Sequence, residues 1–184
     1  MHPAALRSPH SVARRLLALA AVSGVASGLD REEILFWLKH EFLWPAVLPT
    51  EERFLTSLSP SPKDSIAFSW RMEAVYVLGW ALRLRDDLEP PTAEASIGSV
   101  LEQMPGPGDA VAGFVESCAL RPAGEIQAAV EAYFDAHASC CACKSRGQPE
   151  RHGYDIEVVQ ERHRALNWLV QYEHAEWDHV ATDT

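Results

Sequence analysis

Eight residues have types and spacing that could bind a ligand or catalyse a reaction, and they lie in two separate stretches of the chain. They are Arg71, Glu73, Glu161, Arg162, Asn167, Trp177, Asp178 and Asp183. In a shared pocket, a glutamate or aspartate could act as a general base, and an arginine could hold an anionic group of a ligand. The same residue types also pair for structural reasons, because a buried charge is normally paired. Both interpretations predict that the two stretches meet in the folded chain.

The structural interpretation concerns the end of the chain. It assigns Glu161, Arg162, Asp178 and Asp183 to a polar network that holds the C-terminal tail against the last helix. Trp177 supports a packed tail, because exposed aromatic area is better buried. We therefore expect the tail to fold back onto the domain.

A metal site is the other chemistry that the sequence suggests. His137, Cys140 and Cys141 share one face of a predicted helix, with Cys143 nearby, and imidazole and thiolate are good zinc ligands. However, a structural zinc site usually takes paired ligands from separate loops, and no second CxxC or HxxxH is present. Free cysteines are also ordinary small core residues. We expect no metal and no cofactor.

Common catalytic motifs are missing from the sequence. It has no GxSxG, GxxxxGK[ST], GxGxxG or HExxH pattern. One ExxH spacing joins Glu176 to His179, but a carboxylate-bridged metal site normally needs a second. The missing motifs argue against the familiar classes of hydrolase and nucleotide-binding enzyme. The sequence therefore assigns no reaction to the chain.

The elements that would position these residues are predicted to be helices. An apolar stripe predicts a helix from about Asp155, its N-cap, to Tyr172. The run from Ser69 to Arg83 is apolar on nearly every side, which indicates the central helix of the core. Other helices are expected to start at Ser8, Asp30 and Pro49 and to cover about 94–104, 109–115 and 125–144, with a loop at 59–62.

No stretch has the alternation of apolar and polar residues that is typical of a strand. The prediction is therefore an all-α fold: a single compact domain, residues 1–184, of about seven to eight helices. A central apolar helix lies in its core, and the C-terminal tail packs back on it. Residues 1–7 are expected to be disordered or loosely attached.

Charge and composition limit the partners that can be expected. The chain has 184 residues, an apolar fraction of 47% and a net charge of -10. This acidity argues against nucleic acid, because phosphate binding needs clustered basic residues, and it suits a basic protein partner. No apolar run reaches the roughly 20 residues that a membrane helix needs. The oligomeric state cannot be predicted.

The location follows from the cysteines and the N-terminus. Three of the four cysteines are crowded within residues 140–143, which does not suit a disulfide framework and indicates a reducing cytoplasm. The alternative is a secretory signal at Arg14–Gly28, with a basic start and an apolar middle. Against it, Ser8–Pro9 is a good helix start and Gly28 a good helix stop.

Several segments give the chain a family resemblance. In order they are SVARRLLALA after Arg7-Ser8, LPTEERFL, FSWRMEAVYVLGWAL, ALRPAGEI, and VVQERHRALNWLVQYEHAEWDHVATDT. The chain thereby resembles an uncharacterised bacterial family, domain of unknown function 4272. The family carries an aromatic-Arg-x-His-Trp pattern in the helix before the last, where residues 133–138 here keep only His137 and an aromatic residue. The resemblance implies a single domain and no known activity.

Two hypotheses about function follow. The favoured one is a non-catalytic cytosolic domain that binds another protein, as an immunity-like or regulatory partner. It is motivated by the charge, the missing motifs and the six tryptophans, since Trp is common at interfaces. The alternative is an enzyme or small-ligand binder with a polar Arg/Glu/Asp pocket between the central and last helices.

Overall fold

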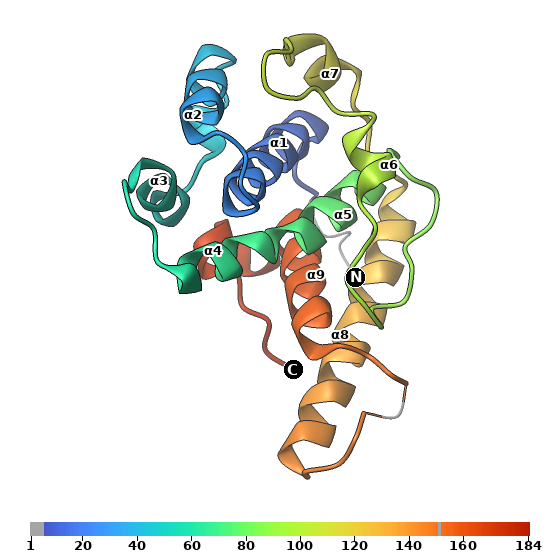
Figure 1. The fold of residues 1–184 in the computed structure, drawn as a ribbon. Helices are drawn as coiled ribbons and strands as arrows, with labels where there is room; N and C mark the ends of the chain where they lie inside the picture. The colour runs from blue at the N-terminus through green and yellow to red at the C-terminus, as the bar shows by residue number, and fades with distance from the viewer. Residues whose placement is uncertain (1–5, 151) are drawn as a thin grey trace.

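The structure is a computed structural model that describes residues 6–150 and 152–184. The regular elements within this part of the chain are all helical, which confirms the all-α prediction (Figure 1). They are α1 (Pro9–Ala26), α2 (Arg31–His40), η1 (Trp44–Ala46), α3 (Pro49–Thr56), α4 (Pro62–Ser69), α5 (Arg71–Ala81), α6 (Gly98–Leu101), α7 (Ala112–Ser117), α8 (Ala123–Ser145), α9 (Ile156–Leu169), η2 (Tyr172–His174) and η3 (Trp177–His179). No helix in the described part has both the length and the apolar character needed to cross a membrane.

The core is built around α5, as its apolar sequence predicts. Every residue of α5 from Glu73 to Ala81 is buried. The helix contacts α1 on one side and α9 on the other, and α9 in turn contacts α8 (Figure 1). Gly79 permits a close approach of α6, because a Cβ atom there would lie 2.6 Å from Cγ1 of Val100. The succession α1, α5, α9, α8 is the frame that positions the site.

Helix starts and stops follow the capping residues of the sequence. The side chain of Ser8 accepts a hydrogen bond from the backbone of Ser11, and that of Asp155 accepts one from Glu157 at 2.9 Å. Gly28 has φ +104° just after α1, a conformation that glycine adopts without strain. These three predicted boundaries are confirmed.

The segment before the central helix differs from the prediction. Residues 59–62 were expected to be only a loop, yet Ser61 caps α4, its hydroxyl accepting the N–H of Asp64 at 3.1 Å, and Pro62 is its first residue. Ser-Pro is therefore a helix start here, because serine caps the helix and proline suits the first position. Ser69 ends α4, whereas we expected it to begin the central helix, which starts at Arg71.

The C-terminal tail packs back on the domain, as expected. Trp177 is 2% exposed and meets Trp168 of α9 edge to face, with 5.3 Å between ring centroids. Asn167 Nδ2 donates to the carbonyl oxygen of Ala181 at 2.9 Å. Two side chains of the last helix, one apolar and one polar, thus hold the tail.

The N-terminal expectation for residues 1–7 falls mostly on 1–5, which lie outside the described residues. Arg7 itself is firmly held. Its backbone N–H donates to the carbonyl oxygen of Leu169 at 3.0 Å, and its Nε donates to that of Trp168 at 2.9 Å. For Arg7 the prediction of loose attachment is wrong, because the C-terminal end of α9 offers unpaired carbonyl groups that an arginine can bind.

Candidate functional site

The central and last helices are joined by a buried ion pair. Arg162 Nε donates to Glu73 Oε2 at 2.7 Å, and the two side chains are 1% and 4% exposed. Arg162 Nη1 also donates to the Tyr133 hydroxyl at 3.0 Å and to the Glu89 carbonyl oxygen at 2.8 Å. Glu73 Oε1 accepts the backbone N–H of Ala95 at 2.7 Å. Both charged groups are therefore fully engaged by the protein.

A second ion pair between the same two helices is less buried, its side chains being 16% and 9% exposed. Arg71 donates to Glu161, and Arg164 reaches the other carboxylate oxygen of Glu161 at 3.5 Å. The pair borders a shallow depression of about 270 Å³. The structure thus brings Arg71, Glu73, Glu161 and Arg162 together, as the sequence suggested, but it pairs each arginine with a glutamate. The polar groups of the predicted pocket are thus paired with one another, and a shallow depression lies beside the outer pair.

The tail residues do not join these pairs. Asp178 accepts a hydrogen bond from the Thr50 hydroxyl of α3 at 3.1 Å, and Asp183 lies in the electrostatic range of His163 and Tyr172. The predicted network of Glu161, Arg162, Asp178 and Asp183 is therefore wrong. The physical reason is position along α9: residues 161 and 162 face α5, whereas the tail packs on the last turn and a half of the helix.

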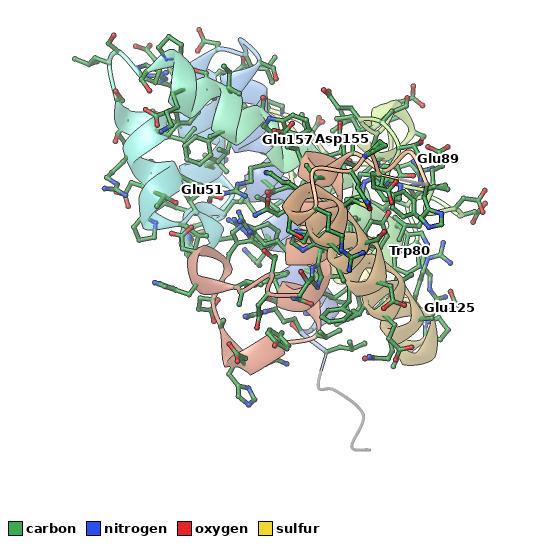
Figure 2. All side chains as sticks on the ribbon, turned by 90° about the horizontal axis from the view of Figure 1, so that it is seen from below. Glu51, Trp80, Glu89, Glu125, Asp155 and Glu157 are labelled. Carbon is green, nitrogen blue, oxygen red and sulfur yellow. The ribbon has the colours of Figure 1, made fainter. Side chains whose placement is uncertain are left out.

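Sequence reasoning missed a further buried pair. Glu51 of α3 accepts two hydrogen bonds from Arg15 of α1, at 2.7 and 2.6 Å, and the Arg15 guanidinium lies 4.5 Å from the centre of the Trp177 ring. Figure 2 shows Glu51 well apart from Glu89, which marks the Arg162 cluster. The signal that could have found it is Arg15 itself, a charge on the apolar stripe of the first helix.

A hollow near several of the predicted residues lies between α8, α9 and the C-terminal segment. We call it the α8–α9 pocket; its volume is about 630 Å³. Helical spacing explains its walls, because residues three or four apart share a helix face. The lining residues are Gln127, Val130, Glu131, Phe134 and Asp135 of α8, His163 and Asn167 of α9, and Val170, Gln171, Tyr172, His174 and Asp183. Two predicted site residues, Asn167 and Asp183, thus meet here.

One buried histidine, His163, lines the pocket, and a second buried histidine, His137, contacts it. The Nδ1 atoms of His163 and His137 are 3.2 Å apart, so one ring donates to the other, and His137 also hydrogen-bonds the backbone of Thr182. Burial, with His137 adding to it, lowers the pKa of His163 from 6.5 to about 4. Burial also lowers the pKa of His137, against the effect of the Thr182 hydrogen bond. Both rings are therefore neutral at pH 7.

The rim of the pocket is acidic. Glu131, Asp135 and Asp183 are all exposed side chains that line it. The negative charges of Asp183 and Glu173 raise the pKa of the Tyr172 hydroxyl, which shows that negative potential gathers at this edge. The carboxylates thus give the mouth of the pocket a negative electrostatic potential.

The backbone at the rim is strained. Gln171, Glu173 and His174 have φ values of 54°, 52° and 55°, in the left-handed region that non-glycine residues rarely adopt. Each costs on the order of 1 kcal/mol, and such strain persists where the surrounding structure imposes it. Here it turns the chain sharply from α9 back toward α8 and closes one end of the pocket.

The cysteine-rich face of α8 was the alternative metal site. Burial is the main cause that raises the pKa of the Cys140 thiol to about 11, so the thiol is not ionised at neutral pH. His137 is engaged by His163 and Thr182 instead. Within residues 6–150 and 152–184, no three His, Cys, Asp or Glu side chains are grouped so that they could hold a metal ion.

Comparison with known proteins gives one match. The family model described as "Domain of unknown function (DUF4272)" matches residues 2–180. No curated protein and no solved structure matches the chain.

Proposed function

The chain belongs to the DUF4272 family, whose function is unknown, and we propose that it is a non-catalytic protein that binds a small organic cation. The ligand we propose joins an apolar body to an ammonium-type group. It occupies the α8–α9 pocket, with its apolar part against α8 and α9 and its charge at the acidic rim. The alternative of a ligand between α5 and α9 has less support, because the charged groups there are paired with one another and the depression beside them is only about 270 Å³.

The observation that carries the proposal is the combination of apolar walls and acidic rim in one hollow. A volume of about 630 Å³ suits a small molecule, since ligand pockets commonly span roughly 300–1,000 Å³. Val130, Phe134 and Val170 supply apolar surface at the walls. Asn167 contributes a polar group there, its Oδ1 atom. Its Nδ2 donates to the Ala181 carbonyl oxygen, whereas Oδ1 has no hydrogen bond to the described residues. A ligand can be both buried and oriented.

The sign of the ligand charge follows from the rim. Among the described residues that line the pocket, three are carboxylates and none is lysine or arginine. In the described part of the chain, no lysine or arginine forms an ion pair with Glu131, Asp135 or Asp183. Unneutralised carboxylates around a low-dielectric hollow favour a cation and repel an anion.

The absence of a reaction is supported by the histidines. A general base works best when its pKa lies near the operating pH. The pKa of His163, about 4, is far below that range, so His163 would be a weak base toward a bound molecule. As a neutral ring it can instead present an apolar edge and a hydrogen bond.

Isothermal titration calorimetry tests the proposal with a matched pair of probes. Phenethylammonium and 2-phenylethanol have similar shapes, but only the first is charged at pH 7.5. We expect the cation to bind more tightly, and Asp135→Asn and Asp183→Asn each to weaken it by roughly three- to tenfold. Glu52→Gln, on α3, removes the same charge away from the pocket and should leave binding unchanged. Equal binding of cation and alcohol, or binding of neither, would refute the proposal.

A second candidate function is the binding of another protein, in an immunity-like or regulatory role in the cytoplasm. The observation that favours it is a pair of exposed aromatic side chains: Phe36, in the middle of α2, is 70% exposed, and Phe42, just after the end of α2, is 77% exposed. Exposed aromatic residues on an acidic protein of net charge -10 suit an interface with a basic partner. The cytoplasmic location we propose is supported by the four free cysteines.

The test is co-purification of a stoichiometric partner from native lysate, repeated with Phe36→Ser and Phe42→Ser. Loss of the partner in these variants supports an interface at α2. Leu58→Ser is the control, since Leu58 is fully exposed on another segment. If no stoichiometric partner co-purifies, or if all three variants retain it, this candidate is wrong.

A further inference from the structure

A second hollow has the opposite charge. It lies between the start of α1, the connection after α2 and the C-terminal segment, and its volume is about 430 Å³. Three arginines line it, Arg7, Arg14 and Arg15, against one carboxylate, Glu176. The whole chain has 26 acidic and 16 basic residues, so this gathering of positive charge runs against its composition. We call it the arginine pocket.

The floor of the arginine pocket is rigid. Glu51 and the carbonyl oxygen of Ala46 hold the two terminal nitrogens of Arg15, and the guanidinium stacks on Trp177. Arg7 is fixed as well: its Nε and Nη2 donate to carbonyl oxygens, and its guanidinium lies 4.4 Å from the centre of the Trp168 ring. Glu51 pairs with Arg15, and Glu176 pairs with Arg7 at 3.4 Å, so the positive charge that remains in excess is that of Arg14.

Two buried donors at this floor lack an acceptor. Arg15 Nε and Trp177 Nε1 make no hydrogen bond within the described part of the chain, although both atoms are shielded. A buried N–H without a partner costs about 1–3 kcal/mol, and such atoms are rare in native proteins. Both belong to residues that line the same hollow. The two donors therefore lie just beneath the surface of the hollow, where their N–H dipoles favour a negative charge above them.

Arg14 supplies the accessible charge. It is half-buried, and its Nη1 donates to the carbonyl oxygen of Phe42 at 3.0 Å. Its remaining donors make no hydrogen bond to the described residues, so the planar guanidinium is held at one end and available at the other. A guanidinium with two free donors binds a carboxylate or phosphate through two parallel hydrogen bonds.

The apolar residues define the rest of the ligand. Phe42, which is 77% exposed, lines the hollow together with Pro45 and Leu48, whereas Trp168 and Trp177 are buried beneath the guanidinium groups of Arg7 and Arg15. We propose that the arginine pocket binds a small organic anion, a carboxylate or phosphate carried on a flat apolar body. Arg14 holds the anionic group, and the side chains of Phe42, Pro45 and Leu48 contact the body. This site is separate from the α8–α9 pocket and takes the opposite charge.

Calorimetry with four probes tests the inference: benzoate, phenyl phosphate, inorganic phosphate and phenol. We expect benzoate or phenyl phosphate to bind at least tenfold more tightly than phenol and than inorganic phosphate, because charge and aromatic body both contribute. The stronger of the two organic anions identifies the anionic group. The proposal would be overturned if phenol, or inorganic phosphate, bound as tightly as both organic anions. It would also be overturned if none of the four probes bound.

Variants separate the site from general charge effects. Arg14→Gln should weaken the organic anion at least tenfold, whereas Arg53→Gln, an exposed arginine of α3, should not. The melting temperatures of both variants show that the fold is kept, since neither arginine is fully buried. The indole N–H resonance of Trp177 should also move when the anion binds. Equal effects of the two variants, or an unmoved Trp177 resonance, would contradict the assignment.

Discussion

Replacement of Glu73 by glutamine is expected to remove a large part of the free energy of unfolding of this protein. The substitution keeps the shape of the side chain but removes the negative charge that faces Arg162 at 2.7 Å. Arg162 is 1% exposed, so water cannot replace the lost charge. Its other partners, Tyr133 and the Glu89 carbonyl, are neutral and only partly compensate. A buried charge left without its partner costs about 3–5 kcal/mol.

That cost is about a fifth or more of the roughly 5–15 kcal/mol by which a domain of this size is normally stable. Urea unfolding followed by circular dichroism measures it. Glu161→Gln is the matched control: it breaks the outer pair between α5 and α9, where Arg71 is 16% exposed and can be partly hydrated. We expect that variant to lose about 1 kcal/mol. If Glu73→Gln loses no more than Glu161→Gln, the view of a sealed inner pair is mistaken.

Three further predictions concern the pocket wall, the tail and the cysteines. Unfolding exposes His163 and returns its pKa from about 4 to near 6.5. As the pH falls, His163 is therefore protonated in the unfolded chain before it is protonated in the folded one. The free energy of unfolding should hence be constant above pH 6.5 and fall by up to about 3 kcal/mol toward pH 4, and His163→Asn should flatten this profile. Trp177→Ala should lower the free energy of unfolding at pH 7 by about 3–5 kcal/mol, because it leaves a cavity at a buried site. Urea unfolding measures this change, and a loss below about 1 kcal/mol would mean that the tail is loosely packed. At pH 8, mass spectrometry should find Cys140 alkylated by iodoacetamide far more slowly than Cys141 and Cys143, and equal rates would contradict its burial.

The helices could be predicted because their signals are local. Ser8 and Asp155 cap their helices through hydrogen bonds to residues two or three positions away, and the apolar run of α5 identifies it as central without reference to any other element. Even the missed α4 carried a local signal, the Ser61-Pro62 pair, which was interpreted as a turn. These features need only the sequence within a few residues.

The pairing of the charged residues could not be predicted in the same way. Helical periodicity gives the face on which Arg162 lies, but not which of several carboxylates meets that face. Glu73 meets it because α5 crosses α9 at that turn, and Asp178 does not because the tail approaches later along α9. Arg15 and Glu51 were overlooked for the same reason, since their contact depends on how α1 and α3 pack.

The candidate pocket depends on still longer-range geometry. Asn167 and Asp183 were both singled out from the sequence, but the face of α8 that completes the pocket, with Phe134 and Asp135, gave no sign of its role. Its residues have the ordinary spacing of a helix that is partly covered. Only the sharp turn after α9, with its left-handed residues, brings the chain back to close the hollow.

The most direct test of the proposed function is a crystal structure of the protein soaked with phenethylammonium. The proposal predicts the phenyl ring against Phe134 and Val170 in the α8–α9 pocket, and the ammonium group within about 4 Å of a carboxylate of Asp135, Glu131 or Asp183. An empty α8–α9 pocket beside an otherwise unchanged protein, or a ligand bound there with its ammonium group turned away from all three carboxylates, would contradict it.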